Sequence, residues 1–412
     1  MNATIISIGD ELLIGQVLNS NASYIAEHIN LAGVTVKYIL TVGDNEDDIL
    51  QTFRKYFSEC DLVIVTGGLG PTHDDVTRSA VCKFFNTKLV VNEEVKENVK
   101  RVLSLRNLKW AAAAENQTLV PEGCRIIPNK HGTAAGLLFE RENKFLVIMP
   151  GVPFEMKSMV DDYLISFFKN INKHSIIIHR TLNTTGITES ALSDLLGDIE
   201  QLTSGAKLAF LPSPTGVKLR ISVNSNDNSA AQNKIEEVEF KIREKSENYI
   251  YGTDNELLEE VIGKLLVKNN FTISVAESCT GGLIADRITN VPGSSQYFER
   301  GVVSYSNKSK IDLLGVSQDL INKYGAVSKE VAETMAEGIR NTSKTDIGLS
   351  TTGIAGPTGA TQGKPVGLVW IGYSDTNKSF AEKYFFGDDR IRVKIRASQA
   401  ALNIVRKQVH QI

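Results

Sequence analysis

The chain lacks the features that mark several common classes of protein. No Cys-x-x-Cys pair occurs among its four cysteines: Cys60, Cys82, Cys124 and Cys279. This scatter favours a reduced, cytoplasmic protein and argues against a zinc site or a disulfide framework. No stretch reaches the 18 or so consecutive apolar residues of a transmembrane helix. Because the strand-like residues Ala3–Ile8 begin almost at once, we expect neither a signal peptide nor a membrane partner.

Two further absences concern partners and catalysis. The formal net charge is −3, which gives no basic surface for a nucleic acid, so direct nucleic-acid binding is not expected. After Ser278 the sequence contains one histidine, His410, so a Ser-His-Asp triad would have to cross domains. At 412 residues the chain is too long for one ordinary core, and two or three domains are expected.

The most informative stretch of the first region is TGGLGPTHDD, residues 66–75. It follows the apolar run Leu62–Val65, which is typical of a buried strand, and precedes a predicted helix. Backbone N–H groups at such a turn suit phosphate. The adjacent carboxylates of Asp74 and Asp75 suit a hard divalent cation, with capping of the helix by Asp74 as the alternative. The candidate phosphate contacts are Gly67, Gly68 and Gly70.

Strand and helix patterns alternate through residues 1–170, which predicts an α/β domain whose parallel sheet has helices on both faces. Ligands of such sheets gather at the carboxyl ends of the strands. Three predicted strands, ending at Ile8, Val65 and Met149, are followed by acidic residues. These candidate metal ligands are Asp10, Glu11, Asp74, Asp75 and Glu155. The alternative is that Asp10 and Glu155 cap helices.

Three motifs, GDELLIGQ, TGGLGPTHDD and MPGVPFEMK, resemble in order and spacing the N-terminal domain of the CinA family of competence/damage-inducible proteins. That domain is similar to the molybdopterin-binding fold. The resemblance implies hydrolysis of the ADP-ribose pyrophosphate with a divalent cation (Mg, Mn or Co), and a monovalent cation is a further candidate cofactor. Asn19 stands where many relatives have aspartate, which would weaken the activity if that acid binds metal. Asn116 and Gln117 are candidate ligand contacts, with a capping or surface role as the alternative.

Residues 171–253 predict a small α+β unit. Strands are expected at Ile176–Leu182 and Val217–Val223, and helices at Gly186–Gln201 and Ser229–Tyr249. The family's counterpart is described as KH-like, but the GxxG loop that clamps nucleic acid is missing from this segment. We therefore expect a spacer or a dimerisation role, and the resemblance implies a homodimer.

Residues 254–412 predict a second α/β domain, in which the strand Phe271–Val275 runs into Ser278 and a helix at Leu283–Ile288. A serine at a strand–helix turn lies where the helix dipole favours negative charge. It needs a neighbouring base to act as a nucleophile, and Lys308 and Lys310 follow the next strand. Cys279 has no histidine nearby in the sequence and is interpreted as a packing residue.

The motifs AESCTGG, PGSSQYFERGVVSYSNKSK, GAVS, GIAGPTG and KPVGLVW resemble the C-terminal domain of the same family, which is nicotinamide mononucleotide deamidase. The resemblance implies a cofactor-free amidase and places motif residues at Ser278, Ser295, Tyr305 and Lys310. Our preferred roles are nucleophile for Ser278, general base for Lys310, and proton relay or orienting group for Tyr305, with Ser295 as the rival nucleophile.

The same region supplies candidates for the rest of an acyl-transfer site. Backbone N–H groups after the serine are the candidate oxyanion donors, and they belong to Thr280, Gly281 and Gly282. A glycine-rich loop is expected to shape the pocket through Gly353, Ala355 and Gly356. Arg390 is the candidate for a substrate phosphate, with Arg392 and Lys394 as alternates.

Three functional hypotheses follow. The first is a cytoplasmic, bifunctional salvage enzyme that acts on nicotinamide mononucleotide and ADP-ribose. The second is an N-terminal domain that only binds a nucleotide or pterin and regulates the rest of the chain. The third, which the family name suggests, is an accessory protein in DNA uptake or repair.

Overall fold

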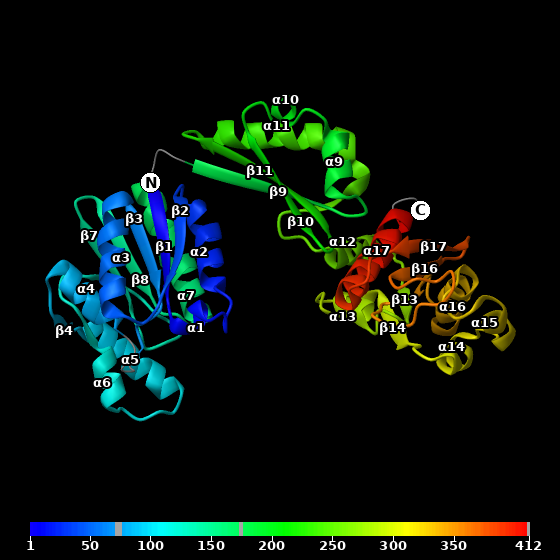
Figure 1. The fold of residues 1–412 in the computed structure, drawn as a ribbon, viewed down its shortest axis with the longest axis horizontal. Coiled ribbons are helices and arrows are strands. Elements are labelled where there is room, and N and C mark those ends of the chain that lie inside the picture. Colours follow the sequence, from blue (N-terminus) through cyan, green and yellow to red (C-terminus); the bar gives the residue numbers. More distant parts are fainter. Residues whose placement is uncertain (71–75, 173–175, 410–412) are drawn as a thin grey trace. The chain divides into compact units, whose positions relative to one another are not determined.

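The computed structural model describes residues 1–70, 76–172 and 176–409 (Figure 1). The chain divides into two compact units, one of residues 1–178 with 224–232 and the other of residues 179–223 with 233–412. Within the described residues, no helix is long and apolar enough to cross a membrane. Two predicted metal ligands, Asp74 and Asp75, lie outside the described residues.

The first unit is built on a six-stranded sheet of order β2-β1-β3-β8-β7-β6. In that order the strands are Thr35–Val42, Asn2–Ile8, Leu62–Thr66, Lys144–Met149, Gly136–Arg141 and Arg125–Ile127. Strands β2, β1, β3 and β8 pair in parallel, as the sequence predicts, whereas β7 and β6 pair antiparallel. A separate ribbon pairs β4 (Leu89–Val91) with β5 (Leu119–Pro121). The sheet is therefore mixed, with an antiparallel edge.

Helices cover both faces of this sheet (Figure 1). They are α1 (Asp10–Leu13), α2 (Ser20–Asn30), α3 (Glu46–Glu59), α4 (Thr77–Phe85), α5 (Glu93–Leu105), α6 (Ala112–Gln117), α7 (Pro153–Met159), the π-helix η1 (Val160–Leu164) and α8 (Ile165–Ile171). Alternation along β1 sends Ile6 toward α3 and Ile5 toward α2, because successive strand side chains point to opposite faces. One apolar cluster therefore lies on each face of the sheet and holds the helices of that face against it.

The middle segment forms a four-stranded sheet of order β10-β11-β9-β12. Its strands and helices are β9 (Ile176–Thr184), α9 (Glu189–Leu196), α10 (Ile199–Thr203), β10 (Lys207–Ser213), β11 (Gly216–Ser225), α11 (Asn228–Ser246), the 3-10 helix η2 (Glu247–Tyr249) and β12 (Ile250–Thr253). The single helix predicted for Gly186–Gln201 is wrong: Gly197 adopts a φ of +75° and separates α9 from α10.

The C-terminal segment forms a five-stranded sheet of order β14-β13-β15-β16-β17. Its strands are β13 (Ile273–Glu277), β14 (Phe298–Val303), β15 (Ile347–Gly353), β16 (Leu368–Ser374) and β17 (Ser379–Phe385). Strands β14, β13 and β15 are parallel, and β16 and β17 add an antiparallel edge. The carboxyl ends of β13, β14 and β15 therefore lie at one edge of the sheet.

Helices also cover both faces of the C-terminal sheet. They are α12 (Leu258–Asn269), α13 (Leu283–Thr289), the 3-10 helix η3 (Ser294–Gln296), α14 (Asn307–Leu314), α15 (Gln318–Tyr324), α16 (Lys329–Ser343) and α17 (Arg390–Val409). Helices α12, α13 and α17 pack into one apolar cluster, and α14, α15 and α16 pack into another. Figure 1 shows α17 apart from the α14–α16 group.

The first prediction concerns the glycine turn after β3. At Gly67, φ is +112° and an added Cβ would lie 2.2 Å from the carbonyl oxygen of Ile8, a backbone atom that cannot move aside. We expect Gly67→Ala to lower the free energy of unfolding by more than about 2 kcal/mol. The measurement is the urea midpoint of the first unit, followed by Trp110 fluorescence in a Trp370→Phe background.

The matched control is Gly15→Ala, where φ is +73° but no atom lies within 4 Å of the added Cβ. Its cost should be only about 1 kcal/mol, from the left-handed backbone alone. Equal midpoints for the two variants would contradict the close approach of Gly67 to β1.

Candidate active site

Ser278 is the first residue after β13, and α13 begins five positions later at Leu283. Its backbone N–H donates to the carbonyl of Thr351 on the neighbouring strand β15, at 3.0 Å. Gly281 and Gly282 turn the chain into the helix with φ values of +63° and +96°, which a residue with a Cβ adopts only under strain. The serine is therefore fixed at the carboxyl edge of the sheet and is almost fully buried.

Lys310 reaches the serine from helix α14. Ser306 caps this helix in a capping box with Ser309, which fixes the start of the helix one turn before the lysine. The Lys310 Nζ lies 3.0 Å from Ser278 Oγ and 2.7 Å from the carbonyl oxygen of Ser304. The carbonyl oxygen of Tyr305 is a third partner, at 3.4 Å. A neutral amine could donate to the two carbonyls and accept the serine proton with its lone pair.

Burial changes the acidity of this lysine. The side chain is 1% exposed, and desolvation lowers its pKa from 10.5 to about 8. No carboxylate lies within salt-bridge distance of Lys310 in the described parts of the chain, and the electrostatic effect of Cys279, which raises the pKa, is smaller than the effect of desolvation. A substantial fraction of Lys310 is consequently neutral at mildly alkaline pH, as a general base requires.

Glu277 is a buried residue of this site that the sequence analysis missed. One carboxylate oxygen accepts from the N–H groups of Gly282 and Ile284, at 3.0 and 3.1 Å, and the other accepts from Ala285 at 2.9 Å. This carboxylate caps α13 and holds the turn that follows Ser278. The signal was present in the sequence, because an acid directly before a strand–helix turn is a candidate helix cap.

A cavity of about 220 Å³ opens beside the serine and lysine. Its wall includes Tyr305, Thr352, Gly353, Ala355 and Arg390, so it brings together most of the predicted site. Further lining residues that the sequence analysis did not single out are Asn307, Ala326 and Val327.

Arg390 lies at the mouth of this cavity. Its guanidinium donates to the carbonyl of Gly356 at 2.8 Å and to the Tyr305 hydroxyl at 3.2 Å. Tyr305 is 63% exposed, so this pair forms part of the rim. The predicted alternates Arg392 and Lys394 are not among the lining residues, although Lys394 Nζ approaches Gly281.

The geometry separates Ser295 from this site. Ser295 precedes β14, whereas Ser278 follows β13, and these strands pair in parallel from Ile273–Phe298 to Glu277–Val303. The two serines thus lie at opposite ends of these neighbouring strands, roughly 15 Å apart for a five-residue strand. The interpretation of Ser295 as a rival nucleophile in the same site is inconsistent with this arrangement.

One predicted oxyanion donor is also corrected. The N–H of Gly282 is donated to Glu277 and does not face a substrate. The N–H groups of Thr280 and Gly281 make no backbone hydrogen bond in the described structure and stay candidates, while the Thr280 hydroxyl pairs with Thr351 at 2.8 Å. Burial raises the pKa of the Cys279 thiol to about 12, which agrees with its interpretation as a packing residue.

The first unit has a cavity of its own, of about 550 Å³, at the carboxyl ends of its parallel strands. Gly67, Gly68 and Gly70 line it, together with the carboxylates of Glu11, Asp44 and Glu155. Gln117 also lines it and donates to the carbonyl of Leu69 at 3.3 Å. Asn116 is not among the lining residues, and its carbonyl accepts from Arg78.

The structure describes three of the predicted metal ligands, Asp10, Glu11 and Glu155. In the described ranges, no three His, Cys, Asp or Glu side chains come together as a metal-binding group. Asp10 and Asp44 bond each other's backbone N–H, and Glu155 accepts from the buried Asn129 side chain at 2.7 Å. These residues do not by themselves make up the predicted metal site. Asn19 caps α2 by accepting from the Ala22 N–H at 3.1 Å, a role that aspartate would fill equally well.

Comparisons with known proteins identify the architecture. Residues 4–170 match the family described as "Probable molybdopterin binding domain", residues 179–252 match "Damage-inducible protein CinA KH domain", and residues 255–409 match "CinA C-terminal domain". A CinA-like protein of Chloroherpeton thalassium is 45% identical over 416 residues, and the match covers 99% of each chain. The chain belongs to the CinA family.

A further relative and one solved structure are also similar to this chain, over different lengths. A relative from Caldicellulosiruptor saccharolyticus, named "Putative competence-damage inducible protein", is 43% identical over 409 residues and 99% of each chain. A solved structure of the competence/damage inducible protein CihA from Agrobacterium tumefaciens is 34% identical, with a TM-score of 0.36. It covers 38% of this chain and 98% of its own.

The second prediction follows from the lowered pKa of Lys310. Between pH 8 and 10.5 the unfolded chain holds a proton that the folded chain has lost, so rising pH stabilises the wild type through this residue. Lys310→Met lacks this contribution. From about pH 7 to about pH 9.5, the wild type should gain about 2 kcal/mol of unfolding free energy relative to the variant.

The measurement is urea unfolding of the C-terminal segment at both pH values, followed by Trp370 fluorescence in a Trp110→Phe background. The matched control is Lys308→Met, which replaces an exposed lysine on the same helix. Its unfolding free energy should differ from that of the wild type by the same amount at both pH values. A constant difference for Lys310→Met as well would show that its pKa is not lowered.

Proposed function

We propose that the C-terminal segment hydrolyses the amide of nicotinamide mononucleotide, giving nicotinic acid mononucleotide and ammonia. The observation that carries this proposal is the 3.0 Å contact between the buried Lys310 Nζ and Ser278 Oγ. The resemblance of the C-terminal motifs to the deamidases supports the choice of substrate. The cavity of about 220 Å³ fits a small molecule rather than a macromolecule.

The reaction would follow the Ser-Lys form of acyl transfer. Neutral Lys310 accepts the Ser278 proton, and Oγ bonds to the amide carbon to form a tetrahedral intermediate. The C–N bond then breaks, and the nitrogen leaves as ammonia with the proton from Nζ. Water, deprotonated by the same lysine, hydrolyses the ester and restores Ser278.

The remaining residues would bind and orient the substrate. The N–H groups of Thr280 and Gly281 are candidates for holding the oxyanion. Arg390, at the rim, has N–H groups beyond its two bonded ones and suits the phosphate. Tyr305 bonds Arg390 and is placed to orient it.

The third prediction concerns this activity. The purified protein should release ammonia from nicotinamide mononucleotide, and Ser278→Ala or Lys310→Arg should lower kcat/KM by at least about 1,000-fold. Because the base acts in its neutral form, kcat/KM should fall about tenfold per pH unit below the lysine pKa of about 8.

Two matched variants isolate the roles of these residues. Lys308→Arg, on the exposed face of the same helix, and Ser295→Ala, at the opposite sheet edge, should retain wild-type activity. Circular dichroism, together with binding of the product nicotinic acid mononucleotide, should confirm that the inactive variants are folded. An active Ser278→Ala, or a folded wild type that releases no ammonia, would overturn the proposal.

We also propose that the cavity of the first unit binds ADP-ribose. Its glycine turn and strand ends support a phosphate-bearing ligand, and the resemblance of its motifs supports pyrophosphate hydrolysis with a divalent cation. The carboxylates on its wall would repel a bare pyrophosphate, which is a physical reason for a cation to accompany the ligand.

The fourth prediction separates hydrolysis from binding alone. With Mg, Mn or Co present, ADP-ribose should be cleaved to AMP and ribose 5-phosphate, and chelation should abolish cleavage. Glu155→Gln should lower the rate at least about tenfold, because the residue lines the cavity, whereas Glu122→Gln, which is exposed elsewhere, should not. Tight binding of ADP-ribose with no cleavage would favour the regulatory module instead.

A further inference from the structure

A third cavity lies outside both proposed sites. It has a volume of about 1,010 Å³ and belongs to the second unit. One wall comes from the end of α11, η2 and β12, and the other comes from α12 and the end of α17. Arg406 joins the two walls, because its guanidinium donates to the carbonyls of Asn248 and Ile250 at 2.8 and 3.2 Å.

Positive charge dominates this cavity. Five cationic side chains line it, namely Arg243, Lys264, Lys268, Arg406 and Lys407. Two carboxylates line it, those of Glu247 and Glu256, so five minus two leaves a surplus of three positive charges.

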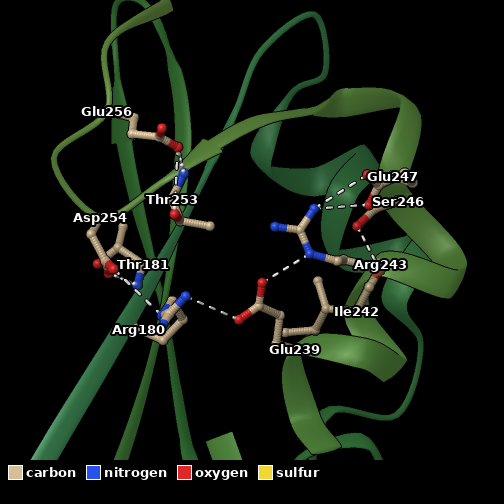
Figure 2. Close-up of polar contacts among 10 residues, drawn as sticks. All are labelled: Arg180, Thr181, Glu239, Ile242, Arg243, Ser246, Glu247, Thr253, Asp254 and Glu256. Carbon is tan, nitrogen blue, oxygen red and sulfur yellow. Dashed lines mark hydrogen bonds and ion pairs between the residues drawn. The ribbon is translucent and has the colours of Figure 1, made fainter. Parts of the chain in front are cut away.

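Both carboxylates are already engaged by protein groups. Figure 2 shows Arg243 bonded to Glu247, and the Thr253 N–H donating to Glu256 at 3.0 Å. Glu256 also accepts from Lys264, a hydrogen bond that lowers its pKa and keeps it ionised. Each acid is therefore hydrogen-bonded to a cation of its own, and Glu247 also acts electrostatically on Arg406.

The three other cations have no such partner. Among the described residues, no carboxylate lies within salt-bridge distance of Lys268, Arg406 or Lys407. Arg406 is 6% exposed, and burial lowers its pKa, which reflects the free energy spent on desolvating its charge. Its guanidinium has five N–H groups, and three of them bond Asn403, Ile250 and Asn248, which leaves two for a ligand.

We propose that this cavity is a binding site for a phosphorylated small molecule of nucleotide class. A buried guanidinium with open N–H groups, flanked by two lysines, suits the oxygens of a phosphate. Tyr249 and Tyr251 also line the cavity and are half-buried, and Tyr251 packs against the apolar core, so the wall contains aromatic surface suited to a base. The volume is sufficient for a nucleotide.

The fifth prediction uses adenosine monophosphate as the probe, with adenosine and inorganic pyrophosphate as its two halves. Hydrogen exchange of the full chain should show that the monophosphate protects residues 245–253, which border this cavity and neither of the other two. The protection reports this site alone, even if the probe also occupies a catalytic cavity. Adenosine should give no protection, and pyrophosphate should give weaker protection than the monophosphate.

Charge reversal tests the same site by affinity. The double variant Lys268→Glu and Lys407→Glu changes two exposed side chains, so folding should be kept, and the probe concentration for half-maximal protection should rise at least about tenfold. Lys378→Glu, an exposed lysine in the turn between β16 and β17, is the control and should behave as the wild type. Unchanged protection in the double variant, or equal protection by adenosine, would overturn the proposal. Absence of any protection of residues 245–253 would do the same.

Discussion

The burial of one lysine is the constraint on which the C-terminal segment depends. Placing Nζ of Lys310 in the interior is unfavourable for an ammonium group, and no carboxylate among the described residues offsets it. The carbonyl oxygens of Ser304 and Tyr305 orient the amine, and Ser278 Oγ is its third hydrogen-bond partner. Burying Lys310 therefore lowers the stability of the fold, and it also favours the neutral amine that a general base needs. Such a cost in stability is typical of catalytic sites.

Much of this arrangement could be predicted from the sequence. Short β-branched runs ending in glycines gave the strand ends, and parallel pairing brought Ser278 and the residues after β15 to one edge. Composition does not distinguish Lys310 from Lys308, because the distinction depends on which face of α14 packs inward. Ser306 determines which residues lie on that face, because it fixes where the helix begins. The separation of Ser295 needed the register of β13 against β14, which no local pattern contains. The role of Glu277 depends on a turn that brings its carboxylate back to the N–H groups of Gly282, Ile284 and Ala285, which the strand pattern does not indicate.

The two proposed catalytic cavities both lie at the carboxyl ends of parallel strands, but the side chains that line them differ in charge. In the first unit, glycines let the β3 turn approach the Ile8 carbonyl closely, and acidic side chains surround the space. In the second unit, the desolvated amine of Lys310 and the guanidinium of Arg390 line the cavity. Helix α17 carries Arg390 at its start and Arg406 near its end, about 24 Å apart for sixteen residues of helix. A single helix therefore borders both the cavity beside Ser278 and the cavity that Arg406 lines.

The proposed catalysis depends most directly on the protonation state of Lys310. That state can be measured by titrating ¹⁵N-labelled lysine side chains by nuclear magnetic resonance, with the Lys310 signal assigned from its loss in Lys310→Arg. If Lys310 is the buried base, its signal should titrate with a pKa of about 8. A Lys310 signal that titrates at the ordinary value near 10.5 would contradict it.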